Sequence, residues 1–265
     1  MDAWAALRLQ VEWGADEALQ EAPVNRLDRE DAARALMPEE GGSPRPTARP
    51  AAPSVLAAAA SAPAAVRRAQ EIAAAAATLD ELRDALGGFD GCPLAATATN
   101  LVFADGNPAA GLMLIGEGPG ADEDRLGKPF VGLSGQLLDR MLASVGLDRT
   151  RLLITNLVPW RPPGNRNPTD SEIMTCLPFL HRHIALAAPR HLVLLGAMAT
   201  RTLTGRSEGI RSVRGRWTEV SVPGLAAPIP ALPMLHPAYL LRSPGAKRDA
   251  WADMIALRLR LDADV

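Results

Sequence analysis

The stretch that decides the fold reads LMLIGEGPGADED and occupies residues 112–124. It opens with an apolar run without polar alternation, which is typical of a strand covered on both faces of a parallel sheet. A glycine-rich turn and a group of acidic residues follow directly. Residues 112–116 are therefore predicted as a buried strand that leads through a tight turn into a helix.

Three further apolar runs are similar, and helical patterns separate them. These runs are residues 152–156, 191–196 and 229–236. Apolar residues recur at intervals near three and four, as on the buried face of a helix, in residues 135–145, 170–187 and 197–203. Strands that alternate with helices form a doubly wound sheet. We predict an α/β fold, a three-layer αβα sandwich with a central, mainly parallel four-stranded sheet.

The composition divides the chain into an extension and a domain. Of the 265 residues, 48% are hydrophobic, which is enough for a packed core. Residues 37–63 are mainly Pro, Ala, Gly and Ser, as in a linker. A helix is predicted over 64–76. We expect an N-terminal extension over 1–63, which ends in this linker, and a folded domain over 64–265.

Several classes of protein are disfavoured. No apolar run reaches the roughly 18 residues that a membrane span needs. The N-terminus lacks a basic start followed by an apolar stretch, so we expect a cytoplasmic protein. Two cysteines, Cys92 and Cys176, cannot form a disulfide framework. They are also too few to supply the four thiolates of an iron–sulfur cluster.

The net charge of −2 argues against a strong nucleic-acid binder, but the charge is unevenly spread. Residues 1–90 carry 15 acidic and 9 basic side chains, whereas residues 91–265 carry 15 acidic and 19 basic ones. Basic clusters occur at Arg211, Arg214 and Arg216, and at Arg242, Lys247 and Arg248. The second part could form a groove that contacts phosphates, or an ordinary solvated surface.

The glycine-rich turn does not match a dinucleotide site. That motif requires glycine at its first, third and sixth positions, and the sixth residue here is Ala121. Glu117 lies within the turn, where its carboxylate would repel a phosphate. A turn that positions Glu117 and the acidic residues behind it to activate water or stabilise a cation is the better account. The acidic residues at 122–124 could instead begin a helix, because negative charge is favourable near a helix N-terminus.

Polar residues also end two other predicted strands. The amide of Asn156 offers an acceptor and two donors, which suits the imide edge of a pyrimidine. His236 ends the fourth run. Phe130, between proline and glycine residues, could stack on a planar ring or pack in the core. Because the chemistry of such sheets lies at the carboxyl ends of the strands, we expect these side chains and Glu117 to share one site.

A metal site made from Cys176, His181 and His183 is an alternative. Cys176 and His183 could share a helix face, but the spacing puts His181 off that face. We expect no metal and no cofactor.

Three motifs together resemble the family 4 uracil-DNA glycosylases. They are GEGPGADEDRLGKPFVG at 116–132, TNLVPWRPPGNRNP at 155–168 and HPAYLLRSPGAKRDAW at 236–251. The likeness covers about residues 85–265. It implies a monofunctional enzyme of base-excision repair that flips uracil out of single- or double-stranded DNA and hydrolyses the N-glycosidic bond to leave an abasic site. We expect a monomer without membrane association.

The resemblance implies a role for each residue of the site. Glu117 would orient or activate water and help the oxocarbenium-like sugar, and His236 would donate to O2 of the departing uracil. Asn156 would read the N3 and O4 edge of uracil. The base would be enclosed by Gly118, Pro119, Gly120 and the ring of Phe130. DNA contacts would come from Ser134, Arg161, Asn165, Arg166, Tyr239, Leu240, Leu241, Arg242 and Lys247, with 240–242 on a loop that enters the duplex.

The sequence departs from this family where its members usually bind a four-iron cluster through four cysteines. The matching positions read Phe89, Cys92, Trp160 and Cys176. An oxygen ligand such as Asp90 could in principle complete a cluster. Two bulky aromatic side chains would instead fill the volume as hydrophobic core, so we expect no cluster. The two cysteines should then be buried close together.

The sequence leaves two alternative functions open. The first is a uracil-DNA-binding protein with little turnover. Superfamily members that trap DNA covalently use a histidine in the loop after the second strand, and residues 161–168 contain none. The second, a small-molecule nucleoside hydrolase, would not account for the basic second part of the chain.

Overall fold

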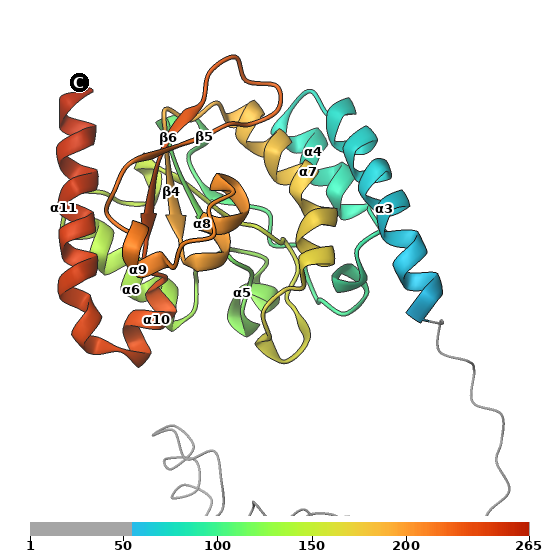
Figure 1. The fold of residues 1–265 in the computed structure, drawn as a ribbon, viewed down its shortest axis with the longest axis horizontal. Coiled ribbons are helices and arrows are strands. Elements are labelled where there is room, and N and C mark those ends of the chain that lie inside the picture. Colours follow the sequence, from blue (N-terminus) through green and yellow to red (C-terminus); the bar gives the residue numbers. More distant parts are fainter. Residues whose placement is uncertain (1–54, 265) are drawn as a thin grey trace, which may run out of the picture. The chain divides into compact units, whose positions relative to one another are not determined.

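The computed structural model describes residues 55–264 (Figure 1). Most of the predicted extension therefore lies outside the described residues. The first described helix, α3 (Val55–Ala75), begins before residue 64, where it was expected. The last part of the predicted linker is thus helical, because its alanines favour a helix more than its lack of large apolar side chains opposes one.

The core is a six-stranded sheet in the order β1-β3-β2-β4-β6-β5. Its four central strands are mutually parallel and confirm the four predicted runs: β2 (Leu112–Gly116), β3 (Leu153–Asn156), β4 (His191–Leu195) and β6 (Ile229–Met234). Two short antiparallel edge strands, which were not predicted, complete the sheet: β1 (Asp105–Gly106) and β5 (Thr218–Val220).

Alternate residues of β2 pack on opposite faces of the sheet. Leu112 and Leu114 join the apolar cluster under α6 (Leu133–Ala143) and α11 (Lys247–Ala263). Met113 and Ile115 join the cluster under α7 (Asp170–Ala187) and α8 (Ala197–Thr204). Helices thus cover both faces, as Figure 1 shows, and the predicted αβα sandwich is confirmed.

A third apolar cluster lies between α3, α4 (Leu79–Gly87) and α7. It contains Phe89, Cys92, Trp160 and Cys176, all buried. The two sulfur atoms are 3.8 Å apart although the residues are far apart in sequence. The prediction that the cysteines lie buried together beside the two aromatic residues is confirmed.

The remaining elements are short. The α-helices are α5 (Ala121–Leu126), α9 (Ile210–Val213) and α10 (Pro237–Arg242). Single 3₁₀ turns span Pro93–Ala96, Pro108–Ala110, Arg149–Arg151, Pro163–Asn165 and Pro244–Ala246. None of the helices over residues 55–264 is long and apolar enough to cross a membrane.

Candidate active site

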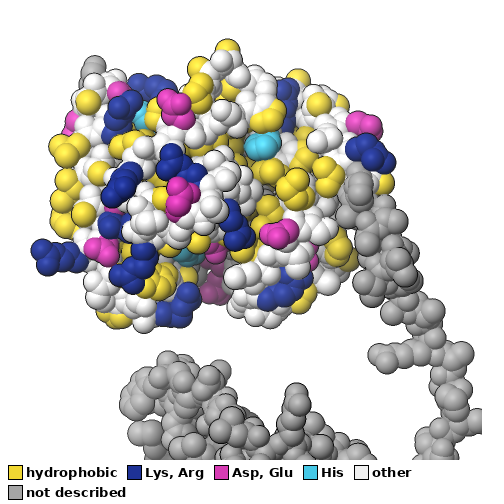
Figure 2. All heavy atoms as spheres, viewed as in Figure 1, with side chains coloured by type: hydrophobic (Ala, Val, Ile, Leu, Met, Phe, Trp, Pro, Cys, Tyr) yellow, Lys and Arg dark blue, Asp and Glu magenta, His cyan; other side chains and the backbone are white. Residues whose placement is uncertain are grey.

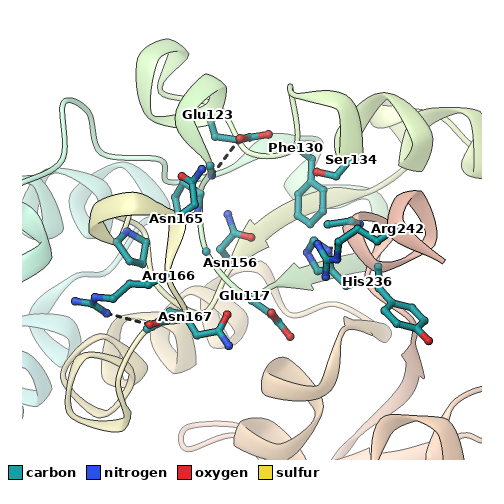
Figure 3. Close-up of a pocket in the computed structure, with 17 residues that line it drawn as sticks. Glu117, Glu123, Phe130, Ser134, Asn156, Asn165, Arg166, Asn167, His236 and Arg242 are labelled. Atoms are coloured by element: carbon teal, nitrogen blue, oxygen red, sulfur yellow. Dashed lines mark hydrogen bonds between the residues drawn. The ribbon is translucent and has the colours of Figure 1, made fainter. Parts of the chain in front are cut away.

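The carboxyl ends of the parallel strands open into a cavity of about 370 Å³. Glu117, Phe130, Asn156 and His236 all line it, as expected from their positions after the strands. Figure 3 shows the rings of Phe130 and His236 side by side, with the Asn156 amide beside them and Glu117 below them in this view. The backbone turn of Gly118, Pro119 and Gly120 forms another wall.

Glu117 is held at the N-terminus of α8. One carboxylate oxygen accepts a hydrogen bond from the backbone N–H of Met198 at 3.1 Å. A Cβ atom at Gly196, whose φ is 103°, would lie 2.4 Å from that oxygen, so only glycine fits there. Burial raises the pKa of the Glu117 carboxyl, while the Met198 N–H and the charges of Arg242 and Arg201 oppose the rise. One carboxylate oxygen of Glu117 is thus held by the backbone, and the other remains available to bind water or a ligand.

His236 is a neutral hydrogen-bond donor. It precedes α10, and its Nδ1 accepts a hydrogen bond from the backbone N–H of Ala238 at 3.1 Å. Burial, together with the charge of Arg242, lowers the pKa of His236 to about 4. The ring is therefore uncharged near neutral pH, and because Nδ1 accepts, its proton lies on Nε2.

Phe130 and Asn156 surround the inner part of the cavity. The Phe130 ring stacks on His236 with centroids 5.6 Å apart. Oδ1 of the buried Asn156 has no hydrogen-bond partner within residues 55–264. A Cβ atom at Gly116 would lie 2.4 Å from that oxygen and 2.6 Å from Cζ of Phe130, so glycine is needed here. An unpaired buried acceptor costs about 1–3 kcal/mol, and an N–H of a bound ligand would remove that cost.

Glu123 is a cavity residue that the sequence analysis did not single out. Its carboxylate accepts three backbone hydrogen bonds, from Gly120 at 3.1 Å and from Val131 and Gly132 at 2.9 Å each. It therefore joins the turn after β2 to the loop that carries Phe130. The available signal was a glutamate three residues after the start of the expected helix, where its side chain can reach back to the N–H of Gly120.

The residues expected to contact DNA divide into three groups. Ser134, Asn165, Arg166, Tyr239 and Arg242 line the cavity. Arg161, Leu241 and Lys247 lie outside the lining, although Arg161 donates to Oδ1 of Asn165 at 2.7 Å. The Arg166 guanidinium makes two hydrogen bonds, of 2.7 and 2.9 Å, to the buried Glu172 carboxylate.

Leu240 forms the third group and requires a correction. It was expected on a loop that enters the duplex, but residues 237–242 form helix α10. Pro237 at the first helical position and the capping side chain of His236 favour this helix. Leu240 is 1% exposed and packs with Leu137 and Leu235, so it is removed from the expected DNA-contacting set.

The residues at the expected cluster position do not fit a four-iron cluster. Only two thiols are present, and the side chains of Phe89 and Trp160 pack beside them in the third apolar cluster. The Cys176 thiol donates to the Cys92 sulfur, which lowers the pKa of Cys92 and raises the pKa of Cys176. Over residues 55–264, no group of three or more His, Cys, Asp and Glu side chains is arranged to bind a metal.

The alternative metal site on α7 does not assemble in the described region either. His183 is buried, and its ring stacks on Phe103 at 4.4 Å. Burial lowers the pKa of His183 to about 4. It is a core histidine.

A cavity at the carboxyl ends of parallel strands, lined by a carboxylate, a histidine, an amide and an aromatic ring, is typical of the ligand-binding site of an α/β protein. Residues 103–259 match the model of the uracil DNA glycosylase superfamily. The chain belongs to this superfamily.

Curated relatives agree with this membership. The chain is 35% identical over 180 residues to a type-4 uracil-DNA glycosylase of Pyrobaculum aerophilum. The aligned residues cover 66% of this chain and 91% of that protein. It is 38% identical over 175 residues to one of Saccharolobus solfataricus, covering 64% and 80% of the two chains. It is 39% identical over 153 residues to one of Thermotoga maritima, covering 57% and 77%.

Proposed function

We propose that this protein is a uracil-DNA glycosylase that hydrolyses the N-glycosidic bond of deoxyuridine in DNA and leaves an abasic site. The observation that carries the proposal is the convergence of Glu117, Phe130, Asn156 and His236 on one cavity. The superfamily membership and the names of the relatives support the same activity. The reaction would belong to base-excision repair.

The inner cavity complements uracil rather than cytosine. Uracil presents an N3–H donor and an O4 acceptor, and the Asn156 amide offers an unpaired acceptor and a donor group. Cytosine presents an N3 acceptor and an N4 donor, which would oppose like groups in that pose. The Phe130 ring, stacked on His236, provides a flat surface for the base.

The charges of the site match those that form as the bond breaks. Cleavage leaves the bonding electrons on uracil, and Nε2–H of neutral His236 would donate to the developing O2 anion. The deoxyribose becomes positive, and the Glu117 carboxylate would stabilise it and accept a proton from the attacking water. The water oxygen then bonds to C1′, and uracil leaves. Preorganised groups of this kind contribute about 10²–10³ in rate each.

DNA must present its base outside the stack to reach this cavity. Flipping a nucleotide costs a few kcal/mol, and less in single-stranded DNA. Ser134, Asn165, Tyr239 and Arg242 at the cavity would hold the flipped strand, with Leu241, Arg161, Arg166 and Lys247 contributing further contacts. We further propose that residues 64–265 act as the catalytic domain, as a monomer, in the cytoplasm.

Release of free uracil from a uracil-containing oligonucleotide tests the proposal. We expect uracil and an abasic strand, with no covalent adduct on a denaturing gel. Tight binding without uracil release would favour the alternative, a uracil-DNA-binding protein with little turnover. Release from free deoxyuridine but not from DNA would favour a small-molecule hydrolase.

Asn156→Asp should weaken uracil recognition. The carboxylate cannot donate to O4, and a buried hydrogen bond lost in this way is worth about 1–3 kcal/mol. The single-turnover rate on uracil DNA should therefore fall by about 10- to 100-fold. An unchanged rate in a variant that melts like the wild type would show that Asn156 is structural.

Binding to DNA should weaken steeply with salt despite the net charge of −2. Figure 2 shows Lys and Arg side chains spread among acidic ones on the viewed face rather than gathered in one patch. Each phosphate contact contributes about −0.9 to the slope of log K against log salt for duplex DNA. Arg242→Ala, at an exposed residue beside the cavity, should reduce this slope by about one.

A matched control uses an arginine that is already paired. The Arg258 guanidinium bonds Asp262 one turn away on α11, so Arg258→Ala should leave the slope unchanged. A flat salt response of the wild type would mean that the basic residues do not face the DNA. Arg214, part of one basic cluster in the sequence, is engaged by the buried Asp253 and is not expected to contribute.

A further inference from the structure

Phe130 has a backbone conformation that its own residue type does not favour. Its φ is 55°, in the left-handed region, although it is a bulky residue without the freedom of glycine. Such a conformation is unfavourable for a residue with a side chain and persists only where the surroundings hold it. The same residue carries the ring that stacks on His236 in the cavity. The contacts that hold this backbone therefore also set the direction of the ring.

Arg149 contacts the backbone at this point. Its Nη1 donates to the carbonyl of Pro129 at 3.1 Å, and its Nη2 donates to the carbonyl of Phe130. The planar guanidinium thus holds two successive carbonyl groups at once, which a point charge cannot do. Arg149 itself lies in the turn Arg149–Arg151 before β3 and does not line the cavity.

Two carboxylates orient the guanidinium. Asp105, on the edge strand β1, accepts from Nη1 at 2.7 Å, and Asp139, on α6, accepts from Nε at 2.9 Å. The Arg149 side chain is only 23% exposed, so these contacts are less screened than those of a surface pair. With both carboxylates in place, the guanidinium has a fixed direction toward the Phe130 loop.

The loop is also confined from its other sides. A Cβ atom at Gly135 would lie 1.8 Å from the Phe130 carbonyl oxygen, so α6 packs directly on that group. Glu123 accepts the next two backbone N–H groups, those of Val131 and Gly132. Arg149 therefore binds the carbonyl groups of Pro129 and Phe130, and Glu123 binds the N–H groups of the two residues that follow.

We propose that Arg149 is a positioning residue for base recognition. Its guanidinium holds the Pro129 and Phe130 carbonyls so that the strained backbone directs the Phe130 ring into the cavity beside His236. The inference rests on the proposed function, in which that ring stacks on uracil. Arg149 would act entirely through Phe130 and without touching the substrate.

The test compares Arg149→Gln and Arg149→Lys with the control Arg151→Gln. Arg151 lies in the same turn, and among the described residues its side chain donates only to the Gly146 carbonyl. We expect both Arg149 variants to lose about tenfold or more in single-turnover uracil release and in inhibition by free uracil, since small misplacements of a positioning group can cost up to about 100-fold. Lysine should not restore uracil release or inhibition, because it keeps the positive charge but lacks the planar guanidinium that binds both carbonyl groups. Arg151→Gln should match the wild type.

A double-mutant cycle separates positioning from a general structural role. If Arg149 acts through the ring, Arg149→Gln should add little further loss of uracil inhibition once Phe130→Ala has removed it. Additive losses would overturn the proposal, as would wild-type release and inhibition in Arg149→Lys. That lysine variant keeps the positive charge between Asp105 and Asp139 and is the one to use if Arg149→Gln does not fold.

The proposed function and the role of Arg149 are contradicted by different results. A wild-type protein that releases no uracil contradicts the proposed function. A wild-type protein that releases uracil, beside folded Arg149 variants that do so equally well, contradicts only the role of Arg149.

Discussion

Glu117→Gln is expected to bind uracil-containing DNA with nearly wild-type affinity while its single-turnover cleavage falls by about 10²–10³-fold or more. The glutamine side chain has the same shape, and its oxygen can still accept from the Met198 N–H. What it loses is the negative charge beside the deoxyribose and the ability to accept a proton from water. Both are needed only as the bond breaks, so the rate falls and the binding does not.

The measurement pairs single-turnover cleavage with DNA binding by fluorescence anisotropy. Glu219→Gln, at an exposed position on the edge strand β5, is the matched control and should change neither. Near-wild-type cleavage by Glu117→Gln would refute the catalytic role of the carboxylate. Equal losses of binding and cleavage would instead indicate that Glu117 shapes the cavity.

The four central strands could be predicted because their apolar runs are continuous and are separated by helical periodicity. The parallel arrangement then places residues that follow the strands at one edge, which is why Glu117, Asn156 and His236 could be assigned to one site. The edge strands β1 and β5 have only two and three residues. Runs so short carry no periodicity, and pairing with β3 and β6 alone defines them.

The support of the site could not be predicted in the same way. Glu123 and its acidic neighbours have the pattern of a helix N-terminus, and that reading holds for the start of α5. The bonds from Glu123 to Val131 and Gly132 depend on how the next loop folds back. Leu240 was misplaced for a related reason, since a loop was assumed where capping by His236 begins a helix.

Trp160→Ala should destabilise the folded protein by about 3–5 kcal/mol, the usual cost of truncating a large buried aromatic side chain. Trp160 is 4% exposed and packs in the cluster with Phe89 and the two cysteines. The substitution would leave a cavity where α4 and α7 meet the loop after β3. Because the surrounding helices relax only in part, the lost contacts are not recovered. Urea unfolding followed by circular dichroism measures the change.

The exposed Trp251 provides the control, because it shows what the same substitution costs outside the core. It is 46% exposed on α11, so Trp251→Ala should change stability by no more than about 0.5 kcal/mol. If Trp160 belongs to a hydrophobic core in place of a cluster ligand, the wild-type protein should also be purified without iron, and a chelator should not alter its unfolding midpoint. A cost below about 1 kcal/mol for Trp160→Ala, or iron bound in stoichiometric amount, would contradict that account. The low cost would show that the Trp160 side chain contributes little to the core, whereas stoichiometric iron would show that the two thiols 3.8 Å apart bind a metal.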